Sequence, residues 1–261
     1  ADATSTASVA GSIAMAYFTN LVKAMIGDNC DIDMSGDVVV NAETDTNARL
    51  IGGALSVSPS KAGVGLNAAA IANNDMTYAF IGKLTEIDAG GSYNQIAKSN
   101  TDFMNLTAAA SVGTNPTGNS VGGVLNVIVM DNESKADVGE GTKINALGDI
   151  NVEAIGDNWL LHITAAIAGT AGTVAAGIGL TTIVCDSDTI ASIGNSAQLI
   201  SKQGSVKVNA EYIQKLIAVL ISAGISTSVT AAAAVANILV SDANTKALVG
   251  EKVTLQGYKD V

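Results

Sequence analysis

The sequence predicts an all-β protein wound as a parallel β-helix (β-solenoid), and three observations support this fold class. Small and β-branched residues dominate: 48% of the chain is hydrophobic but only 3% is aromatic. Such residues suit flat, stacked strands better than interdigitating helices. Two glycine-centred motifs recur about every 55 residues, and inward and outward residue types alternate around them. A constant interval between like residues is what stacked coils produce.

The first motif is an alanine three residues before a glycine that follows an isoleucine, or in two units a valine. Residues at alternate positions on both sides of the glycine are small or apolar, for example Ala79, Ile81, Thr85 and Ile87. This period of two is typical of a half-buried strand. We expect each glycine to mark a corner where a side chain would clash or φ must be positive. The glycines are Gly27, Gly82, Gly139, Gly194 and Gly250.

The second motif is a glycine followed by a strand with one apolar face, clearest in Val38, Val40 and Ala42. Its glycines are Gly36, Gly91, Gly148 and Gly204, with Gly257 in the last unit. Tyr93 and Gln95 take the inward columns of the second unit, which leaves the register open there.

The two motifs define five repeat units in a single solenoid segment, 1–44, 45–99, 100–156, 157–212 and 213–261. We expect each unit to form two coils, although one coil per unit stays open. Nine or so coils spaced by about 4.8 Å would give a rod about 43 Å long. Polar segments such as 73–75 and 131–133 are expected to be turns, and Pro59 and Pro116 to mark a recurrent loop.

Two uncharged stretches, 163–184 and 216–240, are long enough to cross a bilayer as helices. Their Gly, Thr and Ser content argues against this, as do Pro59 and Lys61 in the equivalent stretch of the second unit. Their acidic flanks also lack the basic and aromatic residues that orient membrane spans. We therefore expect no membrane insertion.

The charge pattern excludes nucleic acid as an expected partner. The net charge is −11, and Arg49 is the only arginine. A nucleic-acid-binding surface needs a basic footprint, usually with arginines. The acidity is better suited to keeping an apolar rod in solution.

No residue pattern predicts a catalytic, cofactor or strong metal site. Residues 31–36 begin like a calcium loop, but Ala42 stands where the loop needs a glutamate. Enzymes built on β-helices would need a carboxylate pair or basic residues at a break in the repeats, and none is evident. The weak candidates for a divalent cation are turn acids, for which a solvated acidic edge is the favoured interpretation: Asp75, Asp131, Asp186, Asp188 and Asp242.

The two cysteines and the single histidine also fall into ordinary repeat columns. Cys30 and Cys185 lie in different columns almost three units apart, too far for a disulfide. His162 shares a column with Asn105 and Ala218, which predicts an exposed position without a catalytic role.

The repeat phrase resembles the leukotoxin-type filamentous adhesins of anaerobic bacteria. It consists of an Ala-x-Ile-Gly strand, a Gly-Asp-Val-x-Val-x-Ala strand and a long Ala/Gly/Val stretch, as in residues 136–139, 148–154 and 163–184. The resemblance implies a very large secreted or autotransported protein with a parallel β-helical stalk.

The sequence as a whole therefore predicts a non-catalytic structural or adhesive rod segment of a bacterial cell-surface or secreted adhesin. The alternative is a subunit of a self-assembling extracellular filament, sheath or surface layer. The expected partner is a component of a host or neighbouring cell, or further copies stacked end to end. Because no leader sequence is evident and the ends lack polar caps, we expect the functional unit to be larger than this chain.

Overall fold

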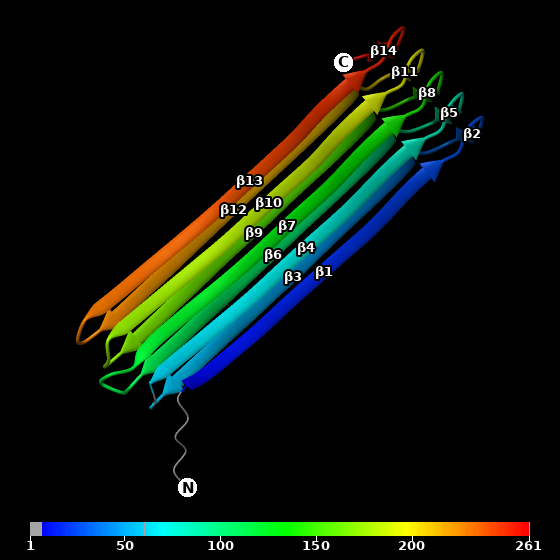
Figure 1. Ribbon diagram of the computed structural model, residues 1–261. Helices are drawn as coiled ribbons and strands as arrows, with labels where there is room; N and C mark the ends of the chain where they lie inside the picture. The colour runs from blue at the N-terminus through cyan, green and yellow to red at the C-terminus, as the bar shows by residue number, and fades with distance from the viewer. Residues whose placement is uncertain (1–6, 60, 261) are drawn as a thin grey trace.

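The protein is a parallel β-solenoid in a computed structural model that describes residues 7–59 and 61–260 (Figure 1). The described residues contain strands and turns but no helix. Nine strands are long: β1 (Ala7–Ile26), β3 (Val38–Ser58), β4 (Ala62–Ile81), β6 (Tyr93–Gly113), β7 (Asn119–Val138), β9 (Ile150–Thr170), β10 (Val174–Ile193), β12 (Val206–Ser226) and β13 (Thr230–Val249). Five are short: β2 (Asp31–Met34), β5 (Glu86–Ala89), β8 (Lys143–Ala146), β11 (Gln198–Ser201) and β14 (Thr254–Gln256).

The strands form three sheets, in which every pairing is parallel. The first long sheet has the order β1-β4-β7-β10-β13, and the second long sheet has the order β12-β9-β6-β3. The short strands form a third sheet in the order β14-β11-β8-β5-β2. All the short strands lie at one end of the molecule, which we call the corner end, and the loops at the opposite end form the tip (Figure 1).

Each repeat unit forms one coil, so the expectation of two coils per unit is wrong. β1 runs to the corner end, β2 crosses it, β3 returns to the tip, and β4 then pairs with β1. The pairing joins Ala7 to Ala62 and Ile26 to Ile81, an offset of one unit. The long strands of 20 or 21 residues take up the chain length that two coils would have used. The expected unit boundaries fall inside β3, β6, β9 and β12, which is a difference of phase and not of period.

The one-coil winding makes the molecule a slab instead of a rod 43 Å long. A strand of 20 residues at about 3.3 Å per residue is about 66 Å long. The five strands of the first long sheet, spaced by about 4.8 Å, stack to a height of about 19 Å. The slab is therefore much longer along its strands than along its solenoid axis.

The first glycine motif stacks at the corner where each long strand turns into a short one. A Cβ at Gly139 would lie 2.6 Å from the carbonyl carbon of Gly82. Positive φ is found two residues later in each unit, at Asn29, Leu84, Gly141, Ser196 and Lys252. From the second unit on, these glycines are therefore required by the close approach of the preceding coil, and positive φ is not their reason.

The inward columns continue through all units, including the second, where the register was open. Tyr93 pairs with Ile150 and Gln95 with Val152, and both side chains are fully buried. The Tyr93 hydroxyl donates to Oε1 of Gln95 at 2.8 Å, and Nε2 of Gln95 donates to the carbonyl oxygen of Ala79 at 2.7 Å. A backbone acceptor thus satisfies the glutamine inside the apolar core.

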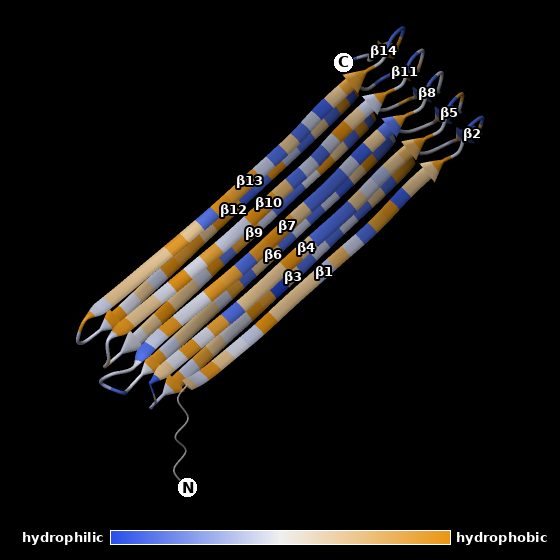
Figure 2. Ribbon diagram, viewed as in Figure 1, coloured by the Kyte–Doolittle hydropathy of each residue, from blue (hydrophilic) through white to orange (hydrophobic). Residues whose placement is uncertain are grey.

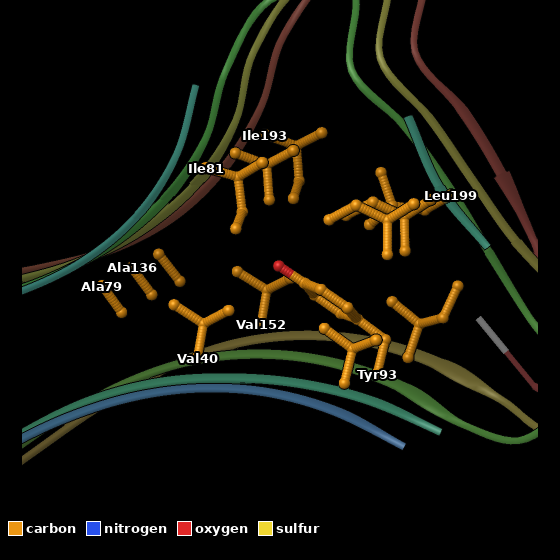
Figure 3. Packing of buried hydrophobic residues seen from close by; sticks show 14 of the residues in the cluster. Val40, Ala79, Ile81, Tyr93, Ala136, Val152, Ile193 and Leu199 are labelled. Atoms are coloured by element: carbon orange, nitrogen blue, oxygen red, sulfur yellow. The ribbon is translucent and has the colours of Figure 1, made fainter. Parts of the chain in front are cut away.

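The largest apolar cluster fills the corner end. Ile81 and Ile193 point from the first long sheet towards Tyr93 and Val152 of the second, while Leu199 points in from the short-strand sheet (Figure 3). Three converging walls leave room for large side chains here. This corner core positions the ends of all long strands.

The polar segments expected to be turns lie in the middle of long strands. Residues 73–75 belong to β4 and residues 131–133 to β7. Their side chains alternate between the inside and the outside, so Asn73 and Asp75 are buried and Asp131 is exposed. Pro59 and Pro116 do lie in tip loops, as expected.

Candidate functional site

The acids named as weak cation candidates form rows on the outside of the first long sheet. One row consists of Asp131, Asp186 and Asp242, which pair in register. A second row, two residues further along each strand, consists of Glu133, Asp188 and Asn244. Burial, with the neighbouring Asp186, raises the pKa of Asp131 above its ordinary value. Asp75 is not part of these rows, because it points inward.

Several of these acids already have partners in the protein. Glu133 contacts Lys135 and the hydroxyl of Tyr78, and Asp188 accepts from Nδ2 of Asn244 at 3.0 Å. Over the described residues, no group of three or more His, Cys, Asp or Glu side chains is placed to hold a metal ion. The rows are therefore an acidic stripe on the outer face.

A chain of buried amides runs along the solenoid axis just inside the acidic stripe. Nδ2 of Asn20 donates to Asp75 at 2.7 Å, and Nδ2 of Asn73 donates both to Asp75 at 3.0 Å and to Asn132 at 2.8 Å. Nδ2 of Asn132 donates to Asn158 at 2.8 Å, and Nδ2 of Asn158 donates to the Tyr212 hydroxyl at 3.0 Å. The chain links the first four coils and fixes their register, because unpaired buried amides are costly.

The sequence does not reveal the amide chain, because Asn73, Asp75 and Asn132 lie in segments that it predicts to be turns and nothing singles out Asn20 or Asn158. The only signal is that asparagine recurs at Asn20, Asn73 and Asn132 near the middle of successive units. Asn and Asp are common in turns, so residue type alone does not separate the two interpretations.

His162 is buried, so the expectation of an exposed side chain is wrong. Its column partners Asn105 and Ala218 are as expected, but this column faces the interior. Nε2 of His162 lies 2.8 Å from Oγ1 of Thr164 and 3.0 Å from Oγ1 of Thr181. Burial lowers the pKa of His162 to about 4, so the ring is neutral at pH 7. Its other ring nitrogen, Nδ1, has no hydrogen-bond partner among the described residues.

The two cysteines lie apart and are free. Cys185 is buried in the column of Met130 and Ser241, as expected. Burial raises the pKa of the Cys185 thiol to about 11, which keeps it unreactive near neutral pH. Cys30 lies at the corner, in the column of Thr85, and its backbone N–H donates to Oγ1 of Thr85 at 3.3 Å.

The two end levels of the solenoid present the features best suited to an interaction. Within the part of the chain that the structure describes, β1 and β3 have unpaired outer edges at one end, and β12 and β13 have them at the other. Inward residues of β13 are about half exposed: Leu239 is 49% exposed, whereas Ile183, its neighbour in β10, is fully buried. An unpaired strand edge is a template for pairing with another strand.

Comparisons with known proteins add no family. No family model, no curated protein and no solved structure matches the chain. In the described residues, no helix is long and apolar enough to cross a membrane.

Proposed function

We propose that the protein is a structural rod module of a large bacterial cell-surface adhesin, in which further coils stack on its two end levels. The observation that carries this proposal is the pair of open strand edges, each about 20 residues long, on a solenoid whose columns repeat in register. Ile26, Ile81, Val138, Ile193 and Val249 form one such column. A further coil of the same kind would continue it without a change of register.

The corner geometry also supports continuation by stacking. Oδ1 of Asp28 accepts from the backbone N–H of Lys83 in the next coil at 2.7 Å, and Oδ1 of Asn195 accepts from Glu251 at 2.8 Å. These side chains thus join the first coil to the second and the fourth coil to the fifth. The cell-surface and adhesive assignment is supported by the resemblance of the repeat phrase to leukotoxin-type adhesins.

The second candidate is a filament, sheath or surface-layer subunit that stacks end to end on copies of itself. The half-exposed inward residues of β13 favour it, because another coil would bury them. The two candidates use the same edges and differ in whether the next coil belongs to the same chain.

The test is electron cryo-microscopy of a chain that carries two copies, next to the single chain over a range of concentrations. Because β14 lies at the corner end and β1 begins at the tip, the two copies are joined by a repeat of residues 206–229, which supplies the returning strand of β12 and a tip loop. The rod module predicts one continuous solenoid of double height for the fused chain. End-to-end particles of the single chain would favour the filament. Both candidates would be overturned if the fused chain formed two separate slabs and the single chain remained a single slab at all concentrations.

Edge variants show whether the stacking uses β13. The backbone N–H groups of Thr230 and Gly250 bond to the preceding coil, so the odd-numbered residues between them face the open edge. Ala233→Pro with Ala243→Pro removes two of these donors and should abolish stacking. Ala233→Ser with Ala243→Ser keeps both N–H groups and should preserve it.

A further inference from the structure

With one exception, the long strands carry their charged residues in the half next to the short strands. In β1 the charge is Lys23, in β4 it is Asp75, and the charges of β13 are Asp242 and Lys246. The exception is Arg49, one residue past the middle of β3. The other half of each long strand, which we call the tip half, is otherwise without charge. Figure 2 shows the change along β1 and β13, where the hydrophilic segments lie towards the corner end.

The outward side chains of the tip half form an apolar band on both faces of the slab. Almost all are Val, Ile, Leu, Met, Ala or Gly, and many are well exposed, such as Ile13 at 77% and Ile51 at 67%. On the first long sheet the band is formed by the outward residues, every second residue, within 9–17, 62–72, 121–129, 174–184 and 230–240. On the second long sheet it is formed by the outward residues within 51–57, 104–112, 161–169 and 217–225.

The interior of the tip half consists mainly of small residues, with a few apolar side chains and several hydrogen-bonded polar ones, and it differs from the apolar core at the corner end. Nδ2 of Asn126 donates to Thr107 at 2.9 Å and to Thr164 at 2.6 Å, and Oγ of Ser120 donates to Ser111 at 2.8 Å. A solenoid surrounded by water gains stability by placing its apolar residues inside. Apolar outer faces over an interior of small and hydrogen-bonded residues are the arrangement expected where the surroundings are apolar.

The length and the boundary of the band match a lipid bilayer. The ranges of seven to eleven residues, at about 3.3 Å each, span about 23–36 Å, which brackets the roughly 30 Å of a hydrocarbon core. Trp159 points outward at the boundary, paired with Asp102 and Lys215. Tyr17 lies at the boundary of the other face and is 73% exposed. Trp and Tyr favour the interface between lipid and water.

We propose that the tip half docks edge-on into a phospholipid bilayer, with acyl chains covering both apolar faces. A second copy would cover one face at a time, whereas lipid covers both. A groove of about 760 Å³ on the first long sheet, lined by Ile13, Leu66, Leu125 and Leu180, offers an apolar surface for such chains. The proposal departs from the expectation, based on the sequence, that the protein does not insert into a membrane. That expectation rested on helical spans, because the sequence did not show which residues lie on the two outer faces of the slab.

The tip itself is compatible with entry into a bilayer. Its described loop residues are mostly small or uncharged polar residues, and Lys61 is the one charge among them. Unpaired backbone groups at the end levels cannot face hydrocarbon. Further coils stacked on the end levels would pair these backbone groups. Full insertion into the bilayer therefore rests on the proposed function, in which such stacking occurs.

Flotation of the protein with vesicles of phosphatidylcholine alone tests the docking, because an uncharged lipid removes electrostatic attraction. The test variant is Ile163→Glu with Ile178→Glu, one outward residue of the band on each face. The matched control is Ile155→Glu with Ile190→Glu, outward residues of the same two strands, β9 and β10, in the charged half. Circular dichroism confirms that both variants fold.

We expect the wild type and the control to float, and the test variant to float on the order of tenfold less, because a buried carboxylate is costly in hydrocarbon. Emission from Trp159 should shift to the blue and be quenched most by lipids brominated near the headgroup. Absence of flotation would overturn the docking. So would loss of lipid-free self-association in the test variant alone, because a second copy would then occupy the band.

Imaging of the same samples without vesicles separates this inference from the proposed function. Stacked particles that do not float contradict the docking and leave the rod module intact. Floating particles that never stack contradict the filament candidate and support docking of single slabs through their apolar faces, without full insertion.

Discussion

His162 is a neutral base enclosed by hydroxyl groups in the middle of the solenoid. The hydroxyl groups of Thr164 and Thr181 hydrogen-bond to Nε2 of the ring. Burial lowers the pKa of His162 from its ordinary value of 6.5 to about 4. A proton is therefore bound more tightly in the unfolded chain than in the folded one. Protonation of this residue opposes folding.

The pH dependence of stability follows from this difference in pKa. Above pH 6.5 the ring is neutral in both states, and between about pH 6.5 and pH 4 the unfolded state alone gains the proton. The histidine should reduce the free energy of unfolding by about 3 kcal/mol over that range. Urea titrations at pH 7.5 and pH 4 on the wild type and on His162→Asn measure it. An equal pH dependence in both proteins would contradict the buried, neutral ring.

Residue type predicted the columns better than it predicted which side they face. The corner columns were clear from the sequence because their inward residues are apolar and their outward residues polar. The column of His162 was misassigned because the interior of the tip half itself holds hydrogen-bonded polar side chains. The alternation persists there with apolar residues on the outside, so a rule that places apolar residues inside gives the wrong face.

At the scale of an element, the corner glycines owe their place to stacking. Gly139 lies directly against Gly82 of the preceding coil, whereas a Cβ at Gly27 would meet only Sγ of Cys30, at 3.8 Å. The two residues share a column and differ in having a coil beneath them. They form a matched pair for an experiment.

We expect Gly139→Ala to lower the free energy of unfolding by about 1–3 kcal/mol, because the new methyl group must push two coils apart. Gly27→Ala should be close to neutral, since no coil lies against it. Chemical denaturation of both variants measures the difference. Equal effects would mean that backbone flexibility, and not the contact between coils, requires glycine in this column.

Strand length is the property of the elements that the sequence did not predict. Strands usually have 3–10 residues, so 55 residues were divided into two coils and the mid-strand Asn and Asp residues were assigned to turns. β4 instead passes through Asn73 and Asp75 without a break, because the interior supplies hydrogen-bond partners for their side chains.

At the scale of the whole molecule, the slab has two differently built halves. The corner half has an apolar core and charged outer faces. The tip half has an interior of small and hydrogen-bonded polar residues with a few apolar side chains, and its outer faces are apolar. Both halves rest on the same one-coil winding, in which each long strand crosses the molecule once. A rod with two coils per unit would have shorter strands. It would therefore have neither the long open edges of the end levels nor the long apolar faces of the tip half.

The distance between the tip and the corner end along one strand tests this winding most directly. Spin labels at Lys61→Cys and Lys83→Cys, in a Cys30→Ser and Cys185→Ala background, lie just outside the two ends of β4. Double electron–electron resonance should give a distance of about 70 Å, because the strand is extended throughout. A distance below about 40 Å would mean that the chain folds back between the labels, and it would contradict the one-coil solenoid.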